Sequence, residues 1–190
     1  LHIEAHSFPT RRSSDLVGAG SVLFDVLDKF ELDEVIISDR NPELINCYET
    51  VRDNPEKMME EIIKINDVFK NLPTLEKQKE FYYAERKRFN ENKTDRILKA
   101  AQMIFINKRC FNRLWRVNSK GEMNVPFGGE RKEEIFEKDN ISRISVKLNE
   151  VKIYNQDYKK TLEYADENTF VYLDPPYLPI GNGQAFTYSK

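Results

Sequence analysis

The feature that most constrains this chain is an apolar run, residues 170–173, which stops at Asp174-Pro175-Pro176-Tyr177. The run is β-branched and aromatic and is bounded by turn residues, which is typical of a buried parallel strand from Phe170 to Leu173. Neither proline can donate a ladder hydrogen bond, so the sheet should end there. We therefore expect Asp174 and Tyr177 at the carboxyl edge of a strand, where open α/β sheets bind their ligands.

These residue types suit a reaction at the exocyclic amine of an adenine. Such an amine is a poor nucleophile, because its lone pair is delocalised into the ring. If the Asp174 side chain and the carbonyl of Pro175 accepted its hydrogens, the nitrogen would move toward an attacking, tetrahedral geometry. The ring of Tyr177 would stack on a base drawn out of a duplex. The structural alternative is a strand followed by a tight turn with a surface tyrosine.

Two earlier segments point to a cofactor site. The run Val17-Gly18-Ala19-Gly20-Ser21 leads into an apolar helical pattern, as in loops that bring their backbone close to a cofactor. About twenty residues later a β-branched strand over 34–39 ends in Asp39, where an acid commonly accepts hydrogen bonds from ribose hydroxyls. The alternatives are plain turn glycines and an Asp39 that simply caps the helix opened by Asn41-Pro42.

The middle of the chain, residues 51–141, reads as mostly helical, with Pro55 and Pro73 as boundaries. Within it, basic residues outnumber acids, and this excess predicts a surface for a phosphate backbone. The alternative is a solvated helix face. The basic residues are Arg86, Lys87, Arg88, Lys93, Arg96, Lys99, Lys108, Arg109, Arg113, Arg116, Lys120, Arg131 and Lys132, and the acids are Glu91, Asp95, Glu122 and Glu130.

Residues 110–128 gather arginine, asparagine and aromatic side chains around a glycine turn. Arginine can read guanine edges, asparagine can read adenine edges, and aromatic rings can wedge or stack between bases. The candidate base-contacting and phosphate-contacting residues are Arg113, Arg116, Asn118, Lys120, Asn124, Pro126 and Phe127. The alternative is a structural hairpin that packs Trp115 and Phe127 into a small lobe.

The α/β pattern returns near the end of the chain. Residues 151–154 read as a strand, 155–158 as its end and 158–164 as a helix. Asp157, followed by Tyr158, is a second acid at the carboxyl end of a strand, placed to accept a hydrogen bond from a cofactor's adenine amine. The alternative is another helix cap.

Residues 1–16 have no usable periodicity, and the string from Ser7 to Leu16 resembles a translated sequencing adapter. We therefore treat 1–16 as a non-native, adapter-like segment; the alternative is a natural basic arm that contacts phosphates. Both histidines, His2 and His6, lie there, so no histidine chemistry is predicted.

No apolar run approaches the roughly 20 residues of a membrane span, and the mean hydropathy is -0.67. Cys47 and Cys110 lie far apart in a chain without an export signal, so reduced thiols and a cytoplasmic location are expected.

The motifs occur in an order that resembles the D12-class DNA adenine-N6 methyltransferases, the DNA adenine methylase type. The resemblance runs from Val17 to Lys190 and rests above all on the run from Gly121 to Gly128. It implies an α/β fold: a Rossmann-like S-adenosylmethionine-dependent methyltransferase sheet, here incomplete, with a mainly helical target-recognition insert. The catalytic domain would comprise 17–51 and 148–190, and the DNA-recognition insert would comprise 52–147.

The resemblance also implies roles for the motifs. S-adenosylmethionine would lie over the loop Gly18-Ala19-Gly20-Ser21, with Asp39 on its ribose and Asp157 and Tyr158 at its adenine. Asp174, also beside the cofactor, and the Pro175-Pro176 turn would hold the target amine, with Tyr177 stacked on the flipped base. The partner would be duplex DNA, with GATC as the expected site, a monomeric enzyme, no metal, and a restriction endonuclease possible in the same system.

The sequence departs from the family at its ends. Leu16 stands where the family has an aromatic residue, a cofactor-contacting lysine is absent, and Lys190 precedes the later strands. We therefore expect a fragment cut at both ends that folds poorly and has little activity. Two alternatives stay open: a methyltransferase for RNA or protein amides, which commonly carry asparagine in place of Asp174, and a DNA-binding remnant without catalysis.

Overall fold

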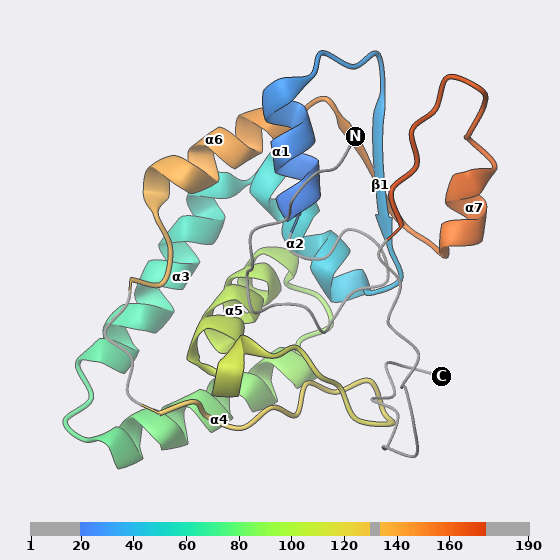
Figure 1. Cartoon of the computed structure of the whole chain (residues 1–190). Helices are drawn as coiled ribbons and strands as arrows, with labels where there is room; N and C mark the ends of the chain where they lie inside the picture. Colours follow the sequence, from blue (N-terminus) through green and yellow to red (C-terminus); the bar gives the residue numbers. More distant parts are fainter. Residues whose placement is uncertain (1–19, 130–133, 174–190) are drawn as a thin grey trace.

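The computed structural model describes residues 20–129 and 134–173, which form helices around a small parallel sheet (Figure 1). In chain order the elements are α1 (Ser21–Lys29), β1 (Val35–Asp39), α2 (Pro42–Asp53), α3 (Pro55–Lys70), α4 (Leu75–Glu91), α5 (Arg96–Arg109), the 3₁₀ turn η1 (Phe111–Arg113), α6 (Lys138–Leu148), β2 (Val151–Asn155) and α7 (Tyr158–Leu162).

The sheet joins two segments that lie far apart in the sequence. Strands β1 and β2 are parallel and in register, from Val35 opposite Val151 to Asp39 opposite Asn155. Both strands therefore end at the same edge of the sheet. Figure 1 shows α1 and α2 on one side of β1 and α7 on the other. The predicted strands over 34–39 and 151–154 and the mixed α/β character are confirmed.

Helices α3, α4 and α5 pack on one another, with α5 also against α2, while α6 lies beside α1 and packs mainly on α2 (Figure 1). In α3 the side chains of Met58, Ile62 and Phe69 recur at helical spacing and are buried. Pro55 is the first residue of α3, where its missing N–H costs nothing, and Pro73 lies in the turn before α4. The predicted helical middle with these two boundaries is confirmed.

The predicted strand from Phe170 to Leu173 is wrong. These residues belong to no strand, and Phe170 is 76% exposed. An apolar run becomes a buried parallel strand only where a neighbour pairs with it and helices cover both faces. Within the described residues the sheet consists of β1 and β2 alone, so the run is left on the surface. The motif that follows, Asp174 to Tyr177, lies outside the described residues.

No helix in the described ranges combines the length and the apolar character needed to cross a bilayer. Cys47 and Cys110 are both free thiols, as expected.

Candidate functional site

The shared edge of β1 and β2 is organised around Asp39. Its side chain is fully buried, and one carboxylate oxygen accepts a hydrogen bond from the backbone N of Asn41 at 2.7 Å. Its carbonyl accepts from the Asn155 side chain at 2.9 Å and from the backbone N of Gln156 at 3.2 Å. The cap of α2 is Asn41, whose side chain accepts from the backbone N of Glu43 and Leu44. The alternative that Asp39 is itself the helix cap is therefore wrong.

Of the predicted glycine loop the structure describes Gly20 and Ser21, and Gly20 lies against Tyr48 of α2, whereas Gly18 and Ala19 lie outside the described residues. Gly20 is the N-cap of α1, with φ +76, and a Cβ there would lie 2.6 Å from the Tyr48 hydroxyl oxygen. Burial, followed by the charges of Cys47 and Asp39, raises the pKa of Tyr48, so this phenol keeps its proton. Gly20, Tyr48 and Asp39 thus belong to one buried cluster, with Ser21 exposed beside it as the first residue of α1.

The sequence did not predict that Tyr48 packs beside Gly20. Tyr48 is a helix residue on α2 that the sequence pattern counts as core, and its contact with Gly20 depends on how α1 packs. The only signal in the sequence is an aromatic residue on the helix that follows the acid-ending strand.

The second acid, Asp157, caps α7. Its side chain accepts from the backbone N of Lys159 at 3.0 Å, so the helix-cap alternative is confirmed. The carboxylate also lies 3.9 Å from the Arg40 side chain and is partly exposed. Helix α7 is tied to the sheet by the hydroxyls of Ser38 and Thr161, 2.6 Å apart. Asp39 is the last residue of β1 and Asp157 comes shortly after the end of β2, so both acids lie at the same edge of the sheet, as the sequence predicted, with Tyr158 exposed next to Asp157 in the chain.

Residues 110–128 form a hairpin, as the structural alternative predicted; this segment is called the hairpin below. Isolated antiparallel bridges join Cys110 to Phe127 and Val117 to Met123. At its tip Gly121 has φ +78, and the Asn118 side chain accepts from the backbone N of Lys120 and Glu122. Asn118 therefore shapes the turn, while Lys120 is exposed at the tip.

The predicted DNA-contacting residues divide into outward and inward groups. Arg116 and Asn124 face each other across the hairpin, with Arg116 Nε donating to Asn124 Oδ1 at 2.7 Å on the exposed side. Phe127 instead packs against Phe69 and Tyr82, with ring centroids 6.2 and 5.5 Å away. The structural alternative is therefore confirmed for Phe127.

Trp115 also packs inward, edge-on to Phe89 at 5.7 Å between ring centroids. The side chain that sequence reasoning passed over is Phe111. It is 50% exposed, and its backbone N donates to the carbonyl of Pro126, itself exposed. The sequence feature that could have indicated Phe111 is its position directly before Asn112 and Arg113. In the structure these two residues both have φ 52.

Several cations of the predicted basic surface are bonded to groups of the protein itself, although the side chains of Arg88 and Arg96 remain 69% and 65% exposed. Arg109 is buried and donates to Asn66 at 2.9 Å. Three others form ion pairs within the fold: Arg88 with Glu85, Arg96 with Glu49 and Lys99 with Glu43.

Exposed positive charge on the hairpin remains at Arg116 and Lys120. Lys108, near the end of α5, is partly buried, and burial, then the charge of Arg113, lowers its pKa. Within the described residues no group of three or more histidine, cysteine or acidic side chains could hold a metal ion.

Replacing Gly128 by alanine is expected to destabilise the hairpin by about 1–3 kcal/mol. A Cβ there would lie 2.5 Å from the Cys110 carbonyl oxygen, which is backbone and cannot rotate away. Urea unfolding measures the change. Gly121→Asn is the control, since its added side chain enters open space and asparagine tolerates a positive φ. Equal destabilisation by both substitutions would contradict the steric argument.

Comparison with known proteins gives a consistent result. The sequence profile of a family described as "D12 class N6 adenine-specific DNA methyltransferase" matches residues 11–190. A type II methyltransferase of Methanocaldococcus jannaschii is 45% identical over 177 residues, covering 92% of this chain and 61% of the relative. A DNA adenine methylase of Haemophilus influenzae is 33% identical over 187 residues, covering 95% of this chain and 60% of the relative.

A DNA adenine methylase of Escherichia coli K12 is 29% identical over 171 residues, covering 90% of this chain and 57% of the relative. The chain thus spans about three-fifths of the length of the curated relatives it matches.

Proposed function

This chain belongs to the D12 class of N6 adenine-specific DNA methyltransferases, and on that basis we propose that it transfers a methyl group from S-adenosylmethionine to the N6 amine of adenine in duplex DNA. The observation that carries the proposal is the family match over 11–190. We further propose GATC as the site, a monomer acting in the cytoplasm, and a cognate restriction endonuclease.

The cofactor proposal is supported by the hydrogen-bond acceptors at the sheet edge. Asp39 and Asp157 offer acceptors after adjacent strands, suited to ribose hydroxyls and an adenine amine. The space beside Gly20 is too narrow for a Cβ, as expected where a backbone loop lies close to its neighbours. We propose that Gly18 to Ser21 and Tyr158 complete this site.

S-adenosylmethionine, when bound, supplies a sulfonium-activated methyl group. The chain's part would be to hold the amine: the Asp174 carboxylate and the Pro175 carbonyl accept its hydrogens, while Pro176 fixes the turn and Tyr177 stacks on the flipped base. Catalysis is then largely positioning and polarisation, without a metal or a covalent enzyme intermediate.

We propose the same division of the chain that the sequence suggested, with a Rossmann-like catalytic part over 17–51 and 148–190 and a DNA-recognition insert over 52–147. Support comes from the paired strands β1 and β2, between which the chain makes α3, α4, α5 and the hairpin. The exposed pair of Arg116 and Asn124, with Phe111 and Pro126 nearby in the hairpin, provides the proposed base-contacting surface.

Transfer of labelled methyl groups tests the function. Duplex DNA containing adenine should accept label from S-adenosylmethionine, whereas RNA and protein should not. Label on RNA or on protein amides would favour the other methyltransferase reading. Salt-sensitive DNA binding without S-adenosylmethionine affinity in calorimetry would favour a binding remnant.

Replacing Asp39 by asparagine is expected to weaken S-adenosylmethionine binding by about tenfold or more, because a hydrogen bond to a charged group contributes about 1.5–3 kcal/mol. The amide oxygen can still accept from Asn41, so the strand end should remain folded. Calorimetry measures the dissociation constant. Asp25→Asn, on the exposed surface of α1, should leave it unchanged. A normal dissociation constant for Asp39→Asn would remove Asp39 from the cofactor site.

A further inference from the structure

One face of α4 holds the returning arm of the hairpin. Tyr82, Arg86 and Asn90 are spaced four residues apart and therefore lie along one side of the helix. The Tyr82 hydroxyl and Arg86 Nη1 both donate to the carbonyl of Val125, at 2.9 and 2.7 Å. These three side chains are called here the α4 anchor.

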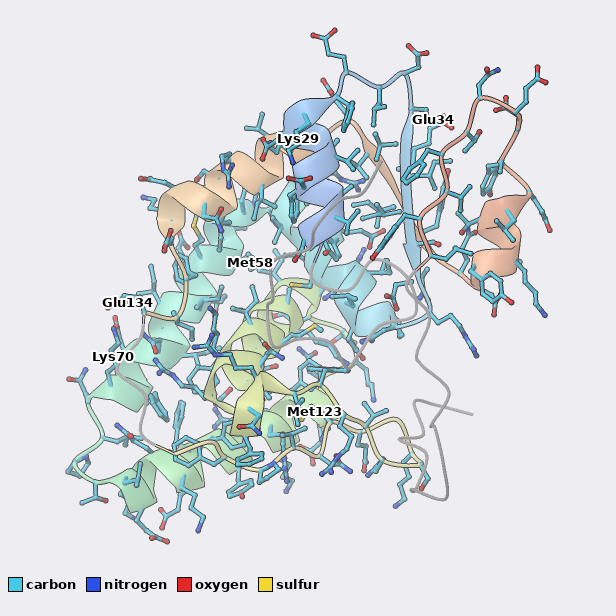
Figure 2. All side chains as sticks on the ribbon, in the orientation of Figure 1. Lys29, Glu34, Met58, Lys70, Met123 and Glu134 are labelled. Carbon is cyan, nitrogen blue, oxygen red and sulfur yellow. The ribbon has the colours of Figure 1, made fainter. Side chains whose placement is uncertain are left out.

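Asn90 binds the hairpin in both directions. Its Nδ2 donates to the carbonyl of Met123 at 3.1 Å, and its Oδ1 accepts from the backbone N of Met123 at 2.9 Å. One side chain thus satisfies both backbone groups of one residue, as a neighbouring strand would. Figure 2 shows Met123 at the end of the molecule where the hairpin lies against α4.

The anchored positions are shielded from water. Tyr82 is fully buried, and Met123 and Val125 are 1% and 2% exposed. Hydrogen bonds in such surroundings meet little competition from water, and a buried backbone group that lost its partner would be costly. The anchor therefore fixes the arm at one place on α4, whereas the isolated bridges Cys110–Phe127 and Val117–Met123 join only the two arms of the hairpin to each other.

Anchored residues alternate with the proposed base-contacting ones. Met123 and Val125 face α4, whereas Asn124 is half-buried on the other side, bonded to Arg116, and Pro126 is exposed. Side chains in an extended arm point alternately to opposite faces, so a slip of one residue would turn Asn124 inward and Met123 outward. The register on α4 thus decides which side chains the hairpin presents.

We propose that Tyr82, Arg86 and Asn90 are positioning residues that set the register of the hairpin on α4 and thereby the base-sequence discrimination of the enzyme. This inference rests on the proposed function, because discrimination requires that the hairpin contact DNA. None of the three needs to touch a base. Their effect passes through Met123 and Val125 to Asn124, Arg116 and Pro126.

The test uses the full chain and two readouts. Trp115 lies in the hairpin, is the single tryptophan of the sequence and packs against Phe89 of α4. Acrylamide quenching of its fluorescence therefore reports how firmly the hairpin is held on α4. Discrimination is measured by competition between a duplex enriched from a randomised pool and the same duplex with one base pair changed. A changed base pair typically weakens specific binding by about 5-fold to 150-fold.

Asn90→Ala is expected to increase Trp115 quenching about twofold and to lower the discrimination ratio by about threefold or more toward one, with weak non-specific binding unchanged. Asn92→Ala is the matched control. Asn92 also makes both donor and acceptor bonds to backbone, but to Thr94 and Asp95 rather than to the hairpin. It should leave both readouts unchanged.

Tyr82→Phe removes only one hydroxyl and is the second test variant, used if Asn90→Ala fails to fold. It should raise Trp115 quenching and lower the discrimination ratio by smaller amounts than Asn90→Ala. A merely structural role would reduce the folded fraction and leave the discrimination ratio of the folded molecules intact, and that result overturns the proposal. Failure of the unsubstituted chain to enrich any sequence would defeat the proposed function, whereas unchanged Trp115 quenching in both anchor variants would defeat the anchor itself.

Discussion

Replacing Asp174 by alanine is expected to lower the rate of adenine methylation by about 10²–10³-fold, the usual cost of removing one positioned electrostatic group from a reacting centre. The lone pair of the adenine amine is delocalised, and the carboxylate is the group that would draw it out of the ring by accepting a hydrogen. Single-turnover transfer of labelled methyl to plasmid DNA measures the chemical step apart from binding.

Two control variants distinguish a loss of catalysis from a loss of folding. Asp174→Asn keeps an acceptor oxygen and should cost less than alanine. Asp166→Ala removes an exposed acid that precedes Asp174 in the sequence and accepts hydrogen bonds from Asn168 and Thr169 of its own turn. This substitution should leave the rate unchanged. If the chain itself turns over too slowly, the equivalent changes in the full-length Methanocaldococcus jannaschii relative carry the test. An alanine variant that methylates at the unsubstituted rate would end the proposed mechanism.

The elements that could be predicted from the sequence are those determined by local signals. A β-branched run that ends in an acid gave β1, and Asn41 followed by Pro42 gave the start of α2 because one caps and the other fits the first turn. Asp157 was expected at the carboxyl end of a strand, with a helix cap as the alternative, and it lies shortly after β2 and caps α7. Each of these depends on residues within a few positions of one another.

The features that could not be predicted from the sequence depend on contacts between residues far apart in the chain. Phe170 to Leu173 has the composition of a strand but no strand beside it in the described structure. Arg96 and Lys99 read as free charge, yet each is paired with an acid of α2 about fifty residues away.

The same limit explains why the α4 anchor was invisible. Asn90 is one polar residue in a charged helix, and its bonds to Met123 span 33 positions. No local pattern marks a side chain whose partner is a backbone group of another segment.

Replacing Phe69 by alanine is expected to lower the free energy of unfolding by about 3–5 kcal/mol, the range for a large aromatic side chain removed from a core. Phe69 is 3% exposed and packs against Phe105 and Phe127, with ring centroids 5.4 and 6.2 Å away. The Arg109 guanidinium lies over its ring at 5.0 Å. Its removal would leave a cavity where α3, α5 and the hairpin meet.

Urea unfolding, followed by helix circular dichroism, measures the loss, and Val68→Ala is the control. Val68 precedes Phe69 on α3 but is 52% exposed, so its truncation should change the free energy of unfolding by no more than about 0.5 kcal/mol. Because Phe127 ends the hairpin and rests on Phe69, the Phe69 variant should also increase acrylamide quenching of Trp115 before global unfolding. Equal effects of the two substitutions would mean that the aromatic cluster does not support the hairpin.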